Sequence, residues 1–207
     1  MANMLVGSAL ADWAGPLKDL MDKGSGSEAH VWLHALKRML RKENPWEGIP
    51  LWRTIKIGTG LRTARDFLRA LNEADRKIGD WADDLLGVPQ FVVATEEGEL
   101  DLAVMTTKQL TGKIEATYAE ICAEIIAFGG QLCPPETGPQ LRLQYENQPE
   151  GEFLFIAMEA IPSSSDAAPS VFYVGRLANG LYLRSSYSFP GDRWLSHQRW
   201  VFVIPRK

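Results

Sequence analysis

At 207 residues, with 45% hydrophobic and 23% charged residues, the chain has the composition of a globular protein that can bury its own core. Its net charge of −4 is uneven: residues 91–170 carry three cations against thirteen acids, and residues 171–207 carry six cations against one acid. The acidic middle argues against a protein that wraps nucleic acid, whereas the basic end is compatible with a small anionic ligand. The competing explanation is that the two regions neutralise each other within one sheet. The distribution of charge, taken by itself, favours this explanation.

The cysteines and the N-terminus predict a cytoplasmic protein without cofactors. Cys122 and Cys133 have apolar neighbours, which is typical of buried, reduced thiols. The first residues lack the basic start of a signal peptide, and no run of apolar residues is long enough to span a membrane. His30 and His34 have a spacing compatible with a metal, but no third ligand stands near them in a suitable direction, so we expect no metal site.

Residues 1–50 are predicted to form a helical extension. A weak helical pattern covers residues 1–22, and a break rich in glycine and serine separates it from an amphipathic helix at 28–42. We expect its apolar side chains to dock onto the rest of the protein, or onto a second copy in a homodimer; they are Trp13, Trp32, Leu36 and Met39.

Residues 51–207 are predicted to form one α+β domain, in which an antiparallel sheet is flanked by about three helices. The alternation at 52–57 predicts a strand, and the following glycines turn the chain into a helix at 65–74. Thr63 and Asp66 resemble a capping box for that helix. A short helix at 80–86 is expected to bury Trp81, and Gly87 ends it.

The second half of the domain is predicted to consist of one further helix and several strands. A hairpin is expected from strands 91–95 and 100–105, and Thr117 with Glu120 forms a capping box for the next helix. The remaining strands are expected at 171–176 and 181–187, joined by an Asn-Gly turn, and at 200–204.

The stretch 133–161 connects these parts. It begins with a rigid Pro-Pro corner, continues through a polar segment that contains Arg142, Tyr145 and Glu146, and ends in the apolar run 153–157. We expect the rest of the domain to be built around this stretch.

Several blocks of the sequence resemble a family of uncharacterised bacterial proteins. The blocks are WRTIKIGTGLRTARDFLRAL, IGDWADDLLG, LCPPETGPQLRLQY followed by NQPEGEFLFIAMEAI, and the terminal VFVIPRK. They cover residues 52–207, so the resemblance implies one compact unit from Trp52 onward. It implies no activity and no roles for individual residues.

The predicted binding site lies in the basic C-terminal region. Arginines interleaved with aromatic residues suit a carboxylate, a phosphate or a stacked base, and Phe189-Pro190-Gly191 predicts a loop of the kind that often carries function. We expect the ligand to contact six residues: Arg142, Tyr145, Arg193, Trp194, His197 and Arg199. The competing account is that these arginines pair with carboxylates of the acidic middle, such as Glu146 or Glu152.

No stretch has the specificity of a catalytic motif. Cys133 with His197 is a conceivable nucleophile and base, and a pocket that joins Arg142, Glu136 and His197 would favour an enzyme. Three functions therefore stay open. The first, which we favour, is a binding module for a protein partner or a small anionic ligand. The others are an enzyme acting on a small molecule or a nucleotide between residues 133–146 and the C-terminal loop, and an assembly subunit that dimerises through its N-terminal helices.

Overall fold

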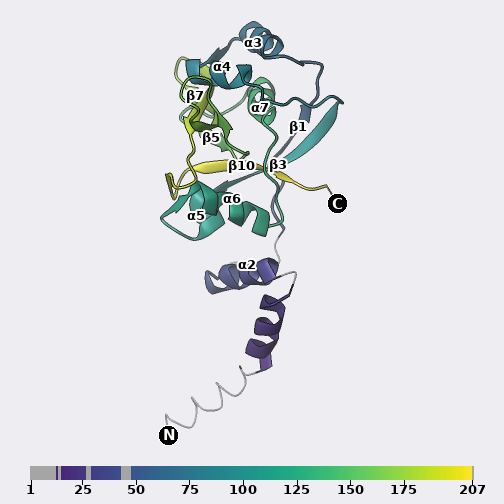
Figure 1. Ribbon diagram of the computed structural model, residues 1–207, viewed down its shortest axis with the longest axis vertical. Coiled ribbons are helices and arrows are strands. Elements are labelled where there is room, and N and C mark those ends of the chain that lie inside the picture. Colours follow the sequence, from purple (N-terminus) through teal and green to yellow (C-terminus); the bar gives the residue numbers. More distant parts are fainter. Residues whose placement is uncertain (1–12, 14, 27–28, 43–47, 207) are drawn as a thin grey trace. The chain divides into compact units, whose positions relative to one another are not determined.

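The structure is a computed structural model that describes residues 13, 15–26, 29–42 and 48–206 (Figure 1). The chain divides into two compact units, Met1–Gly48 and Ile49–Lys207, whereas the sequence placed the boundary after residue 50. Much of the helix expected at 1–22 lies outside the described residues. Among the described residues, no helix is long and apolar enough to cross a membrane.

The first unit contains two helical segments. Residues 15–24 are helical, and α2 (Ala29–Leu40) occupies most of the range expected for the amphipathic helix. Between the two segments lies an apolar groove whose lining includes the four side chains expected to dock. The lining residues are Trp13, Pro16, Leu17, Leu20, Trp32, Ala35, Leu36, Met39 and Leu40.

The second unit is built on an eight-stranded mixed sheet. Seven strands follow the order β1-β3-β10-β5-β7-β8-β2, and β6 pairs with β7 beside this path. The strands are β1 (Arg53–Ile57), β2 (Arg76–Ile78), β3 (Gly98–Thr106), β5 (Phe153–Ile156), β6 (Ile161–Pro162), β7 (Pro169–Leu177), β8 (Gly180–Tyr187) and β10 (Arg199–Ile204). A separate two-stranded sheet joins β4 (Glu115–Thr117) to β9 (Arg193–Leu195).

The α+β class is confirmed, but the expectation of a purely antiparallel sheet is wrong. β10 comes last in the chain and inserts between β3 and β5, where it runs parallel to β5; β2 runs parallel to β8. The expectation of about three flanking helices is also wrong, because the described part of this unit has five. They are α3 (Ala64–Glu73), α4 (Asp80–Gly87), α5 (Thr107–Thr111), α6 (Tyr118–Ala127) and α7 (Thr137–Gln144).

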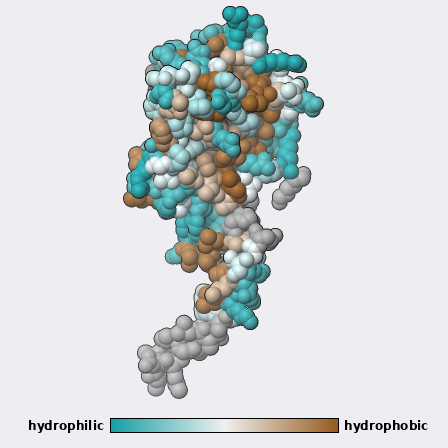
Figure 2. Space-filling model, viewed as in Figure 1, coloured by the Kyte–Doolittle hydropathy of each residue, from teal (hydrophilic) through white to brown (hydrophobic). Residues whose placement is uncertain are grey.

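The helices lie on both sides of the central strand β10. Figure 1 shows α5 and α6 on one side of it and α3, α4 and α7 on the other. The core between these layers includes the fully buried side chains of Trp200, Phe172 and Phe67. On the face drawn in Figure 2, most of the second unit's surface is hydrophilic, with separate hydrophobic patches.

Local signals predicted the helix starts well. Thr63 and Asp66 form the expected capping box at α3, and Thr117 and Glu120 form the one at α6.

The buried face of α4 differs from the expectation. Trp81 was expected to be buried but is 53% exposed. On α4 the buried positions are Ala82, Leu85 and Leu86 instead.

The hairpin expected from strands 91–95 and 100–105 is wrong. Residues 91–94 form no strand, and β3 begins at Gly98 and pairs with β1. The backbone N–H of Ala94 donates to Oε2 of Glu136 at 2.8 Å, so a buried side chain replaces the missing strand partner. By contrast, the hairpin of β7 and β8 around the Asn-Gly turn is confirmed.

The polar segment after the Pro-Pro corner is a helix, α7, which the sequence pattern did not predict. Its first residue is Thr137, so Pro139 stands at the third position, where a helix needs no backbone donor. Gly138 lets α7 approach β7 closely, because a Cβ atom at this position would lie 2.7 Å from Cβ of Phe172.

One face of α7 fastens the edge strand β1. Glu136, Gln140 and Gln144 are spaced four residues apart, so their side chains share a helix face. The backbone N–H of Lys56 donates to Oε1 of Gln144 at 2.8 Å, and Nε2 of Gln144 donates to the Lys56 carbonyl at 2.8 Å. Gln144 therefore occupies the backbone N–H and carbonyl of Lys56 at the middle of an edge strand, where they would otherwise be open to another chain.

Candidate functional site

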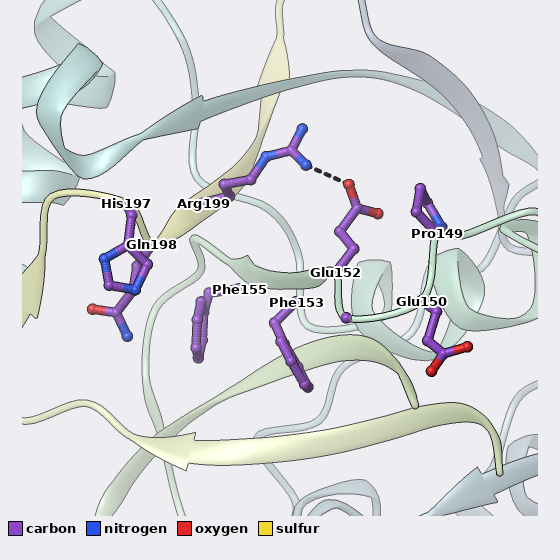
Figure 3. Close-up of a pocket in the computed structure, with 9 residues that line it drawn as sticks. Pro149, Glu150, Glu152, Phe153, Phe155, His197, Gln198 and Arg199 are labelled. Carbon is purple, nitrogen blue, oxygen red and sulfur yellow. Dashed lines mark hydrogen bonds and ion pairs between the residues drawn. The ribbon is translucent and has the colours of Figure 1, made fainter. Parts of the chain in front are cut away.

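A cavity of about 520 Å³ lies where β5 and β10 begin. The two strands run parallel, with Arg199 opposite Leu154, so the turns that precede them lie next to each other. We call this the C-terminal cavity; it is lined by Pro149, Glu150, Gly151, Glu152, Phe153, Phe155, His197, Gln198 and Arg199 (Figure 3).

Two phenyl rings form the apolar part of the C-terminal cavity. Phe153 is 37% exposed, and Figure 3 shows its ring beside that of Phe155. Trp194 lies behind Phe155 at a centroid distance of 4.8 Å and is itself only 5% exposed. The ring of Phe155 therefore has an aromatic support in Trp194, which does not line the cavity itself, and Phe153 packs against Tyr173 at a centroid distance of 6.3 Å.

An ion pair borders the cavity on the other face of the strands. Arg199 pairs in register with Leu154, and Figure 3 shows the side chains of Arg199 and Glu152 pointing away from the phenyl rings. Nη1 of Arg199 donates to Oε1 of Glu152, and the Tyr145 hydroxyl donates to Oε2 of the same carboxylate at 2.8 Å. The side chain of Glu152 is 11% exposed and that of Arg199 is 40% exposed. Glu152 thus joins two predicted site residues, and the guanidinium of Arg199 keeps N–H donors that Glu152 does not use.

Tyr145 supports the carboxylate from inside the protein. Its ring meets that of Trp52 edge to face at 5.2 Å, and the guanidinium of Arg53 lies 4.4 Å from its centroid. Burial, with the hydrogen bond to Glu152, raises the pKa of Tyr145 to about 12, so the phenol stays protonated. Tyr145 is 5% exposed and does not line the cavity.

Arg142 has a structural environment, contrary to its predicted role in binding. It is fully buried, and Nη1 donates to Oε1 of Gln148 at 2.5 Å while Nη2 donates to the carbonyl of Tyr145. Among the described residues, no carboxylate lies within ion-pair distance of it. Burial, with the nearby charges of Arg76 and Arg176, lowers the pKa of Arg142 to about 10.

Arg193 lies outside the C-terminal cavity. It belongs to β9, where Nη1 donates to Oε1 of Glu115 at 2.8 Å in an exposed ion pair. The region expected to be one loop therefore contains a short strand that pairs with β4. His197 and Arg199 follow β9 and are the two predicted residues that line the cavity.

The conceivable catalytic groups are not brought together. Cys133 is 3% exposed and borders a different cavity from the one that His197 lines. Burial raises the pKa of Cys133 to about 12, so its thiol stays protonated. Both carboxylate oxygens of the buried Glu136 accept backbone hydrogen bonds, from Gly58 at 2.8 Å and from Ala94.

The sequence analysis missed the residues that form most of the cavity wall. Phe153 and Phe155 belong to the apolar run 153–157, to which no role in binding was assigned, and Glu152 was named as a counterion of the arginines in the competing account. Phe153 and Phe155 alternate with the buried Leu154 and Ile156, so the period of two was the available signal.

No family model matches the chain, and no curated protein and no solved structure matches it. Among the described residues there is also no group of three or more His, Cys, Asp or Glu side chains arranged to hold a metal ion.

Proposed function

We propose that the protein is a binding module that recognises its partner in the C-terminal cavity. The observation that carries the proposal is that one cavity is lined both by the exposed Phe153 and by the ion-paired residues Arg199 and Glu152. A lining that combines aromatic residues with an arginine suits a group with an apolar part and a terminal acceptor, such as an aromatic carboxylate or an acidic side chain of another protein.

The charges around the cavity are consistent with such a ligand. Glu152 accepts a hydrogen bond from one nitrogen of Arg199, whereas a guanidinium has five N–H groups. Arg199 can therefore donate to a ligand while it stays paired with Glu152. His197 lies exposed in the lining of the same cavity, and its imidazole N–H can donate to an acceptor. Glu150 opposes an anion, which favours a ligand that points its acceptor toward Arg199.

Catalysis has less support than binding. Both oxygens of Glu152 already accept hydrogen bonds, the phenol of Tyr145 stays protonated, and the Cys133 thiol borders another cavity. The pocket that would favour an enzyme, one that joins Arg142, Glu136 and His197, is not among the cavities described.

The test is an NMR titration of the ¹⁵N-labelled protein with three small probes that share one ring. Benzoate carries an acceptor, benzyl alcohol is neutral, and benzamidine is a cation. The proposal predicts that benzoate shifts the amide signals of residues 149–155 and 197–199 and binds most tightly of the three. Shifts elsewhere in the protein, or tighter binding of benzamidine, would contradict it.

A further inference from the structure

A second surface of the molecule concentrates exposed aromatic side chains. Trp81 on α4, Tyr187 at the end of β8 and Phe189 just beyond it are 53%, 44% and 47% exposed. The ring centroids of Trp81 and Tyr187 are 6.1 Å apart, and those of Tyr187 and Phe189 are 6.3 Å apart. Phe153, at 37%, is the one other exposed aromatic side chain among the described residues of the second unit.

A small cavity of about 210 Å³ lies beside these rings. We call it the serine cavity; it is lined by Trp81, Ser163, Ser170, Ser185, Ser186 and Tyr187. Its lining, within the described residues, consists of hydroxyl groups and two rings and includes no charged side chain.

The directions of the hydrogen bonds indicate what the serine cavity offers to a ligand. The hydroxyl of Ser163 donates to Asp166, that of Ser170 donates to the Ala168 carbonyl at 3.3 Å, and that of Ser186 donates to the Tyr187 carbonyl at 3.3 Å. Each of these hydroxyl protons is used within the protein, so the remaining oxygen lone pairs of Ser163 and Ser170 can accept from a ligand. The Ser163 oxygen also accepts the backbone N–H of Asp166 at 3.5 Å, and Ser186 points to the strand face opposite Ser185 and Tyr187. The cavity therefore suits a ligand that supplies several hydrogen-bond donors.

Two aspartates hold the walls of the serine cavity together. Asp84 of α4 accepts from the backbone N–H of Ser164 at 2.8 Å and from the hydroxyl of the same residue. Asp166 accepts from the backbone N–H of Ala168 at 3.0 Å and from the hydroxyl of Tyr187 at 3.1 Å. Hydrogen bonds thus hold the helix, the loop and the strand end of the site together in the absence of a ligand. This preorganisation lowers the entropic cost of binding.

We propose that the serine cavity and its aromatic surface bind a neutral polyhydroxylated ring, such as one pyranose residue of a sugar. The apolar C–H face of the ring packs on Trp81 and Tyr187, and its hydroxyls donate to the serine oxygens. An anion lacks the donors that this lining requires. The serine cavity, at about 210 Å³, is smaller than the roughly 300–1,000 Å³ of cavities for drug-sized ligands, so its volume suits a single ring.

The experiment is an NMR titration of the full chain with methyl glucoside, methyl galactoside and methyl mannoside, and with tetramethylammonium as a cationic probe. The inference predicts that at least one glycoside shifts the indole N–H signal of Trp81 and the backbone amide signals of residues 185–187, with a dissociation constant of roughly 1–10 mM. Trp81→Ala, at an exposed position, should abolish the amide shifts. Ser185→Val, which fills the cavity, should weaken binding at least tenfold.

Three results would overturn the inference: no glycoside shifts any signal at about 50 mM, only tetramethylammonium does, or the shifts persist unchanged in Trp81→Ala. Phe153→Ala is the matched control, because it removes an exposed ring from the C-terminal cavity and should leave glycoside binding intact. The two sites are tested separately, so failure here leaves the proposed function unaffected.

Discussion

Arg142 and Arg199 show that two arginines from one predicted site have different environments in the fold. Arg142 is buried and donates to the neutral oxygens of Gln148 and Tyr145, whereas Arg199 is partly exposed and pairs with Glu152. The sequence pattern placed both arginines in one binding site. The burial of Arg142 depends on the packing of α7, a helix that the sequence pattern did not predict.

The first prediction concerns Arg142. Arg142→Ala removes the donor from Gln148 and from the Tyr145 carbonyl and leaves a void, so we expect a loss of about 3 kcal/mol or more in the free energy of unfolding. Urea denaturation followed by circular dichroism measures this loss. Arg65→Ala, at an exposed position on α3, is the control and should change stability by less than about 0.5 kcal/mol. A loss as small for Arg142 as for Arg65 would refute the structural role.

The second prediction concerns the two free cysteines. Thiol titration under denaturing conditions without reductant should find both groups reduced. In the native protein at pH 8, Cys133 should react far more slowly than a small thiol, because burial raises its pKa to about 12 and limits access. Cys122 is less buried and should react first. Finding no free thiols, or equally fast reaction of both in the native state, would contradict this assignment.

At the scale of single elements, the sequence predicted the helices and turns that are marked by residues close together in the chain. Capping boxes at Thr63 and Thr117 and the Asn-Gly turn act within a few residues, so they are visible in the chain itself. The helix α7 was missed because Gly138 and Pro139 are typical of turns, although a first helical turn tolerates both. The prediction of a hairpin at 91–95 was wrong because the backbone N–H of Ala94 donates to Glu136, a side chain that is distant in the sequence.

The third prediction tests how α7 holds the chain around it. Each oxygen of Glu136 accepts from a backbone N–H, so Glu136→Gln points an amide NH₂ at one of these donors. We expect a loss of about 2 kcal/mol in the free energy of unfolding, measured by urea denaturation. Glu159→Gln changes an exposed carboxylate in the same way and should have almost no effect. Equal stability of the two variants would show that Glu136 does not fasten these segments.

At the scale of the whole molecule, the sheet order was beyond the reach of sequence patterns. The placement of β10 between β3 and β5 depends on contacts between strands that lie about 50 to 100 residues apart in the chain, which no local signal encodes. The same long-range pairing creates the C-terminal cavity, because it brings the beginnings of β5 and β10 together. For that reason the sequence predicted two residues of its lining, His197 and Arg199, and missed the wall that β5 supplies.

The fourth prediction is that residues 49–207 fold without the first unit. This range forms a compact unit with its own sheet and core, so it should show cooperative thermal unfolding and a native circular dichroism spectrum. An unfolded fragment would mean that the first 48 residues complete the core. Homodimerisation through the first unit stays a prediction, and analytical ultracentrifugation of the full chain and of this fragment would test it.

The central claim, that the C-terminal cavity binds an acceptor through Arg199, is tested most directly by comparing two single variants. Benzoate affinity and melting temperature should be measured for Arg193→Ala and Arg199→Ala beside the unchanged protein. We expect Arg193→Ala to match the unchanged protein in both, because its ion pair with Glu115 is exposed and contributes little. Arg199→Ala should weaken benzoate binding at least tenfold, and should cost about 1 kcal/mol of stability because Glu152 loses its counterion. Unchanged benzoate affinity in Arg199→Ala, or an equal loss in Arg193→Ala, would contradict the account.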